Sequence, residues 1–136
     1  MYQLTKTAEA IIRQFKSDGL DKDLTGGLWF QRAPQNPTFP YGVFYFLGTS
    51  YDEIAGAAHD TIIDISVQFN LFSDEADGGE EVLNLCSLLS NTFDWAALNH
   101  DDYQVIKCQR EGMTGLLYTD EIWQVTLQYE ISIIKE

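Results

Sequence analysis

Four side chains in this sequence are soft enough to bind a transition metal, namely His59, Cys86, His100 and Cys108. Zinc sites usually take two ligands from one short motif, such as two cysteines two residues apart. No two of these four residues lie that close along the chain. We therefore expect no metal and no cofactor. The two histidines, which border acidic residues, are interpreted as surface residues, and the two thiols as reduced and partly buried.

The residues that could act as nucleophiles or bind phosphate have no supporting motif. Cys86 lies on the apolar side of a predicted helix, so its thiol is expected to be buried and inert. The chain has no G-x-S-x-G motif, and its twenty-one acidic residues make coincidental carboxylate pairs unavoidable. The glycine pairs at 26–27 and 78–79 lack the frame of a phosphate-binding loop. The sequence thus indicates a protein that is not an enzyme.

The charge of the chain is strongly negative and unevenly distributed. Residues 1–51 contain five basic and four acidic residues, whereas residues 52–136 contain three basic and seventeen acidic residues. A net charge of −13 repels a nucleic-acid backbone, which argues against groove binding or phosphate tracking. The charge either serves solubility or lines a passage through which nucleic acid slides without sticking.

Length and composition fit one folded domain that spans residues 1–136. Apolar residues make up 45% of the chain, which argues against disorder. No apolar run approaches the roughly 20 residues that cross a bilayer, and the first six residues lack the profile of a secretion signal. We expect a cytoplasmic protein without a membrane partner.

Two segments alternate apolar and polar residues without interruption, from Ile63 to Leu71 and from Trp123 to Ile133. Successive side chains of a strand point to opposite faces, so each segment predicts a long strand with one apolar and one polar face. The polar positions carry hydrogen-bonding groups without an evident reactive centre. We infer a sheet whose polar face serves as a surface.

The remaining elements follow from periodicity and from turn residues. Helical spacing predicts a helix over residues 4–17, ended by Gly19, and a second helix opened by 73–81 with Asp77 and Glu80 in capping-box spacing. Strands are expected at 28–32, 41–47, 61–72 and 103–111 and within 116–135, with a loop at 48–60 and a turn at 112–115. The result is an α+β fold, a mostly antiparallel sheet of about four to five strands with two helices on one face.

The strand at 41–47 carries aromatic residues on both faces, and the three prolines of residues 33–40 precede it in an extended segment. The Phe39-Pro40 bond is a candidate for the cis form. Tyr41 and Tyr45 share one face with Val43, and the two phenylalanines lie on the other. A strand that is apolar on both faces is either covered on both or contacts a partner.

The order of elements resembles the tail terminator, or tail completion, proteins of long-tailed bacteriophages and related prophage particles. The resemblance covers roughly residues 4–134 and depends on two loose structural motifs. One is the P-x-x-x-x-F-P-Y segment that leads into a strand, here Pro34 to Tyr41. The other is the step from a strand through F-S-D into a helix, here Phe69 to Glu81.

This resemblance implies a structural protein without catalysis. Such proteins form a ring, commonly a homo-hexamer, at the head-proximal end of the virion tail, and they are assembled in the cytoplasm of the bacterial host. The ring ends polymerisation of the tail tube and presents the surface for head–tail joining. The implied partners are further copies of the chain, the tail tube protein and the head–tail connector protein, and DNA passes through without specific binding.

Two sets of residues become candidates for these contacts, and a long loop adds a third region. The lumen or contact face comprises Ser66, Gln68, Asn70, Thr126, Gln128 and Glu130. The subunit or tube interface comprises Tyr41, Phe44, Tyr45, Tyr51, Asp52, Glu53 and Ile54. We expect the loop at 48–60 to dock on the neighbouring subunit or on the tube.

Two other functions remain open. A head–tail connector, or neck protein, would share a small α+β body and a ring. A small-ligand binding or enzymatic domain would instead use the aromatic strand at 41–47 together with Trp29, and it would require a deep pocket with convergent polar groups.

Overall fold

The computed structural model of the chain describes residues 2–53, 61–76, 78–101 and 103–135. Two helices and five strands account for most of them, joined by one short 3-10 helix. In chain order the elements are α1 (Tyr2–Ser17), η1 (Leu20–Lys22), β1 (Leu28–Phe30), β2 (Tyr41–Glu53), β3 (Thr61–Ser73), α2 (Gly78–Phe93), β4 (Tyr103–Thr119) and β5 (Ile122–Lys135).

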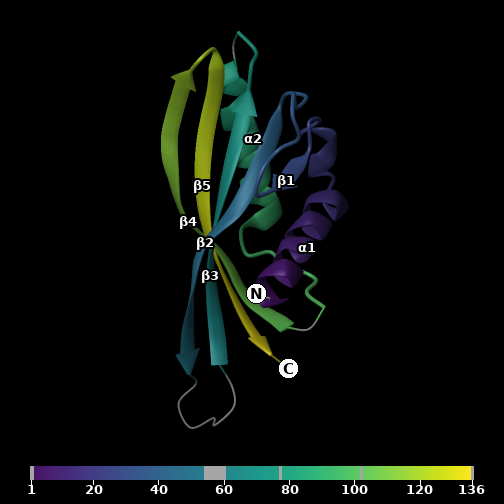
Figure 1. Cartoon of the computed structure of the whole chain (residues 1–136), viewed down its shortest axis with the longest axis vertical. Coiled ribbons are helices and arrows are strands. Elements are labelled where there is room, and N and C mark those ends of the chain that lie inside the picture. Colours follow the sequence, from purple (N-terminus) through teal and green to yellow (C-terminus); the bar gives the residue numbers. More distant parts are fainter. Residues whose placement is uncertain (1, 54–60, 77, 102, 136) are drawn as a thin grey trace.

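The five strands form one sheet in the order β1-β2-β3-β5-β4. Every pairing is antiparallel except that of β1 with β2, which is parallel. Both helices lie on the same side of the sheet, and the β2–β3 and β4–β5 hairpins extend to opposite ends of the molecule (Figure 1). The α+β prediction, with about five strands and two helices on one face, is confirmed.

The core lies between the helices and the apolar faces of β3 and β5. The register pairs Val67 with Tyr129 and Phe69 with Leu127, and all four side chains are buried. The ring of Phe69 lies 5.1 Å from that of Phe93 in α2 and 5.6 Å from that of Tyr129, between ring centroids. These close aromatic contacts fix α2 on the sheet.

Both helices bury the faces that the sequence predicts. In α1, the chain turns at Gly19, whose φ of 81° is left-handed and suits a residue without Cβ. At the start of α2, the hydroxyl of Ser73 donates a hydrogen bond of 2.8 Å to the carboxylate of Glu81. The predicted capping box includes Asp77, which lies outside the described residues. Within the described residues, no helix has the length and apolar character needed to cross a bilayer.

The glycine pair at 26–27 has a structural role. A Cβ atom on Gly26 would lie 1.7 Å from the carbonyl oxygen of Thr38, so the proline-rich segment can approach only a glycine here. The backbone amide of Gly26 donates a hydrogen bond of 2.8 Å to the carbonyl of Pro40. The Phe39-Pro40 peptide bond is cis. This packing leads the chain into β2.

Two predicted boundaries are wrong. Residues 48–53, predicted as loop, continue β2, and residues 54–60 lie outside the described residues. The turn predicted at 112–115 lies within β4, where the register shifts twice, between Arg110 and Gly112 and between Thr114 and Leu117. The glycines there accompany β-bulges. The hairpin turns instead at Asp120 and Glu121, whose φ angles of 53° and 64° match a two-residue hairpin turn without glycine.

Candidate functional site on the open face of the sheet

The six polar residues predicted to form a lumen or contact face lie side by side on the sheet face opposite the helices. The register of β3 and β5 places them in three consecutive cross-strand pairs: Ser66 with Glu130, Gln68 with Gln128, and Asn70 with Thr126. Alternation in each strand predicts a polar face, and the observed pairing joins the two faces into one surface, hereafter the polar ladder.

Side-chain hydrogen bonds connect the polar ladder across the strands. The hydroxyl of Thr126 donates to the amide oxygen of Asn70 at 2.8 Å, and the amide of Gln128 donates to the oxygen of Gln68 at 3.3 Å. The amide nitrogen of Gln68 also lies 2.6 Å from the hydroxyl of Tyr45 on β2. The ladder thus extends over three strands, and the candidate interface residue Tyr45 belongs to it.

The polar ladder differs along its length in exposure. Ser66 and Gln128 are exposed, whereas Asn70 and Thr126 keep only 9% and 8% of their surfaces accessible. The pair of Asn70 and Thr126 therefore serves mainly to form hydrogen bonds within the sheet, and it offers little contact surface. The outer part, near Ser66, is the part that a partner or a passing polymer can touch.

Charge on this face is sparse and paired. The carboxylate of Glu130 accepts a hydrogen bond of 2.9 Å from the ammonium group of Lys107 on β4, and this bond raises the pKa of Lys107. At the next row, the hydroxyl of Ser132 donates to the carboxylate of Asp64. The strongly negative charge of the chain is therefore not concentrated on the polar ladder, which consists mainly of amides and hydroxyls.

The second candidate set, the subunit or tube interface, is only partly surface. Tyr41 lies on the open face, where its ring stacks on Phe72 with centroids 4.9 Å apart. Phe44 is fully buried in this chain and contacts Phe69 on the helix side, with centroids 5.7 Å apart. Its assignment to an interface is therefore wrong, because its ring already packs against Phe30, Phe46 and Phe69 within the chain.

Three further members of that set, residues 51–53, lie at the end of β2. They are paired with the start of β3 through Tyr51 and Ile63, Asp52 and Ile62, and Glu53 and Thr61. Ile54 lies outside the described residues. Their backbone positions place them at one extreme end of the molecule (Figure 1).

Both cysteines are buried and free, as the sequence predicts. Burial raises the pKa of the Cys86 thiol, and it raises the pKa of Cys108 to about 12. A buried thiol in its neutral form is a poor nucleophile. The sulfur of Cys86 lies 3.3 Å from that of Met113, which packs over it from β4.

The prediction that His100 is a surface residue is wrong. Its ring is 9% exposed, and its Nε2 lies 3.0 Å from the hydroxyl of Thr7 in α1. Nearby, the guanidinium of Arg13 pairs with the carboxylate of Asp101 at 3.0 Å. The segment after α2 thus packs against α1, and this contact buries His100. The acidic residues that follow His100 in the sequence are typical of a surface loop and led to the wrong prediction. His59 lies outside the described residues.

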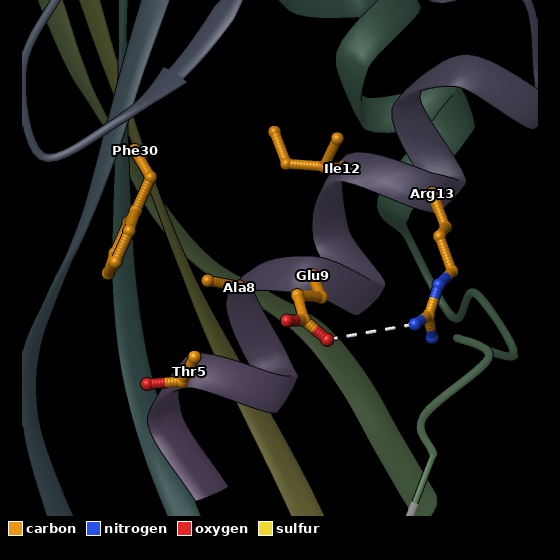
Figure 2. Close-up of a pocket in the computed structure, with 6 residues that line it drawn as sticks. All are labelled: Thr5, Ala8, Glu9, Ile12, Arg13 and Phe30. Atoms are coloured by element: carbon orange, nitrogen blue, oxygen red, sulfur yellow. Dashed lines mark ion pairs between the residues drawn. The ribbon is translucent and has the colours of Figure 1, made fainter. Parts of the chain in front are cut away.

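An apolar hollow of 360 Å³ lies between α1 and β1. Figure 2 shows Ala8 and Ile12 on the same stretch of α1 as Thr5, across from Phe30 of β1. The only charges drawn there are Glu9 and Arg13, which pair with each other at 3.7 Å. This hollow offers apolar surface without a convergent set of polar groups, so its geometry does not favour the small-ligand hypothesis.

Trp29 is the other residue that the small-ligand hypothesis names. Its indole N–H donates a hydrogen bond to the carbonyl of Gly26 within the chain, so this donor is already used.

β4 carries an exposed apolar strip that its sequence pattern does not predict. Its members are Met113, Leu116, Leu117 and Tyr118, with 51%, 36%, 53% and 56% of their surfaces exposed. The sequence feature that could have predicted this strip is the uncharged run G-M-T-G-L-L-Y-T from 112 to 119, but its two glycines are typical of a turn.

In the described part of the chain, no group of three His, Cys, Asp or Glu residues is arranged for a metal ion.

No protein-family model and no curated protein sequence matches this chain. Solved structures do share its fold. A chain in the virion of a native gene transfer agent particle has a TM-score of 0.70 at 11% sequence identity, and the match covers 91% of both chains. A second solved protein has a TM-score of 0.65 at 13% identity, with 93% of this chain and 94% of that chain covered. The chain therefore has the fold of a component of a phage-like virion particle.

Proposed function

We propose that this protein is a structural component of a phage-like particle that forms a ring on the head-proximal end of the tail tube. The ring ends tube polymerisation and provides the surface for joining the head. The observation that carries the proposal is the fold shared with a chain of a gene transfer agent virion over 91% of both chains. The sequence resemblance to tail terminators supports the head-proximal end of the tail tube as the position of this protein in such a particle.

The polar ladder supports this role because it suits a surface that touches a polyanion without holding it. Its accessible part offers neutral groups, Ser66 and Gln128, and its one acid is paired with Lys107. Binding to a nucleic-acid backbone depends mainly on unpaired basic groups. A ring lined by this face would let DNA pass without trapping it.

The acidic residues also have a defined place in this role. Asp74 and Glu75 follow β3, and Asp120 and Glu121 form the β4–β5 turn. Both connections lie at the same end of the molecule (Figure 1). In the proposed ring this end forms one acidic rim, which would favour a basic surface on the tube or connector and disfavour a like-charged one.

A binding experiment with the purified protein distinguishes the terminator role from that of a head–tail connector. The protein is mixed with isolated tail tubes that lack it and, separately, with portal-side rings. Sedimentation with tube ends alone is the result that the terminator role predicts. Sedimentation with portal-side rings alone contradicts it and favours the connector.

A further inference from the structure

Among the described residues, each side of the sheet has a stretch of strand edge without a paired strand, in addition to the outer edge of the short β1. On the first side, β1 pairs only with Gly42–Phe44 of β2, and its last contact is the amide of Gln31 with the carbonyl of Phe44. Among the described residues, no strand pairs with the outer edge of β2 from Leu47 onward. This stretch is hereafter the β2 edge, residues 47–53.

On the second side, β4 is the terminal strand of the sheet. Its outer edge is covered near Cys108, whose carbonyl accepts a hydrogen bond of 2.7 Å from the amide of Trp95. Beyond that point no described strand pairs with its outer side. Residues 112–119 are hereafter the β4 edge.

The β4 edge lacks the charged residues and prolines that commonly protect such strands in monomeric proteins, although bulges interrupt its register. Edge strands are normally guarded by charged residues or proline, which prevent another chain from pairing with them. Residues 112–119 contain no charge and no proline, although 21% of the whole chain is charged. They also expose four large apolar side chains, and three of them, Met113, Leu117 and Tyr118, are more than half accessible. Such an edge fits a partner that contributes a strand.

The β2 edge matches the β4 edge over residues 47–51 and ends in two acids, Asp52 and Glu53. Residues 47–51 carry no charge, and Leu47 is 50% exposed on a stretch where Gly48, Thr49 and Ser50 are exposed as well. Two copies that each carry a net charge of −13 repel each other, so close contact is least costly where both surfaces are uncharged. The chain itself thus supplies a suitable partner for its β4 edge.

The strand directions agree with this pairing. β2 runs antiparallel to β3, β3 to β5 and β5 to β4, so β2 and β4 point in opposite directions within one sheet. If a second copy continues the sheet in the same orientation, its β2 meets β4 in the antiparallel sense. The contact is head-to-tail, and a head-to-tail contact generates a ring when the rotation closes.

We infer that the β4 edge of one copy pairs with the β2 edge of the next and joins their sheets into one continuous closed sheet. This inference builds on the proposed ring and names the surfaces that form it. The two edges lie at opposite ends of the sheet (Figure 1), so the strands must be inclined to the ring axis, as in any closed sheet. The polar ladders of neighbouring copies then lie on one common face.

A charge placed on the β4 edge tests the pairing. Leu117→Lys introduces a residue that natural edge strands use to prevent pairing. Leu88→Lys makes the same change on an exposed residue of α2, where Leu88 is 37% accessible, and serves as the matched control. Sedimentation velocity at the highest soluble concentration measures assembly, and thermal unfolding confirms that both variants fold.

The expected result is that wild type and Leu88→Lys assemble, whereas Leu117→Lys stays monomeric and still unfolds in one cooperative transition. Equal assembly of all three proteins overturns the edge pairing and leaves the proposed terminator role standing. A wild type that remains monomeric also overturns it, since free edges should pair without another partner. Failure of the terminator role is seen separately, as binding to portal-side rings.

Disulfide trapping tests which strands meet. Thr49→Cys and Leu117→Cys are introduced singly and together, and the native thiols stay buried at Cys86 and Cys108. Under mild oxidation, the double variant should give a ladder of covalent oligomers, and a mixture of the two single variants should give covalent dimers. Each single variant alone should remain uncross-linked, because in a head-to-tail contact residue 49 does not meet residue 49. Dimers from one single variant alone contradict the inference.

Discussion

The two faces of the β3–β5 pair come from the same two strands and differ in almost every physical property. Ile65, Leu127 and Ile131 are at most 1% exposed on the helix side, where they pack in a core without polar partners. The neighbours of these residues in sequence, such as Ser66 and Gln128, lie on the open side among hydrogen-bonding groups. One face therefore stabilises the fold, and the other is available for contact.

The difference predicts that the stability of the fold and the proposed contact function can be altered separately by substitutions at neighbouring residues. Burial of apolar surface contributes about 25 cal/mol per Å², so the helix side supplies most of the stabilisation. Hydrogen bonds contribute about 0.5–1.5 kcal/mol each in net terms. Substitutions on adjacent residues of one strand should then give unfolding in one case and an altered assembly with a normal fold in the other.

The largest effect is expected when a charge is placed in the core face. Leu127→Asp buries an unpaired carboxylate at a fully buried position and should cost about 4 kcal/mol or more, enough to leave the chain largely unfolded. Gln128→Asp, on the next residue and on the open face, should change the free energy of unfolding by no more than about 0.5 kcal/mol. Urea denaturation measures both. Similar losses in the two variants would show that the open face is covered within the folded chain.

The second largest loss of stability is expected from a substitution that opens a cavity beneath α2. Phe69→Ala should destabilise the fold by about 3–5 kcal/mol, because its ring fills the space between Phe93 and Tyr129. The matched control is Phe72→Ala on the open face of the same strand, which should cost clearly less because Phe72 is only partly buried. The two unfolding free energies are compared in urea. An equal loss in the control would contradict the distinction between the faces.

A smaller effect is expected within the polar ladder. Asn70→Leu should cost about 1–3 kcal/mol, because it leaves the buried hydroxyl of Thr126 without the acceptor at 2.8 Å. The double variant Asn70→Leu/Thr126→Val should recover part of this loss, since no buried polar group is then left behind. A double-mutant cycle measured by thermal unfolding gives the coupling. Additive losses would mean that this hydrogen bond contributes nothing to stability.

The last effect concerns the pH dependence of the core face and is small just above pH 9. Burial raises the pKa of Cys108 from 9.0 to about 12, so the folded state keeps the thiol protonated where the unfolded chain loses its proton. Its contribution to stability is complete below pH 9 and is lost as the pH rises from about 9 toward 12. Wild type should therefore lose more stability over that range than Cys108→Ala. Parallel pH profiles of the two proteins would contradict this prediction.

The sequence alone predicts the core well, because alternation and helical spacing are local properties. The positions of β3 and β5 and the burial of Cys86 follow from patterns in a few neighbouring residues. Such patterns also give the two faces of β2 correctly, with Tyr45 on one and Phe44 on the other. They do not indicate which face of β2 packs within the chain, so they do not separate the buried Phe44 from a surface residue.

What the sequence could not predict depends on contacts between distant residues. The pairing of Ser66 with Glu130 is a matter of register, and the burial of His100 depends on α1, 93 residues away at Thr7. The apolar strip on β4 was missed because Gly112 and Gly115 are typical of turns and here accompany bulges. The true turn at Asp120 and Glu121 carries no glycine, so its signal is weak.

The length of the tails made by a particle that lacks this protein tests the proposed function most directly. The gene is deleted in a producing phage or particle, and tails and heads are counted and measured by electron microscopy. The account predicts unjoined heads and abnormally long tails, because nothing ends polymerisation of the tube, and normal length when the wild-type chain is restored. Tails of normal length that merely lack heads would contradict it and favour a connector.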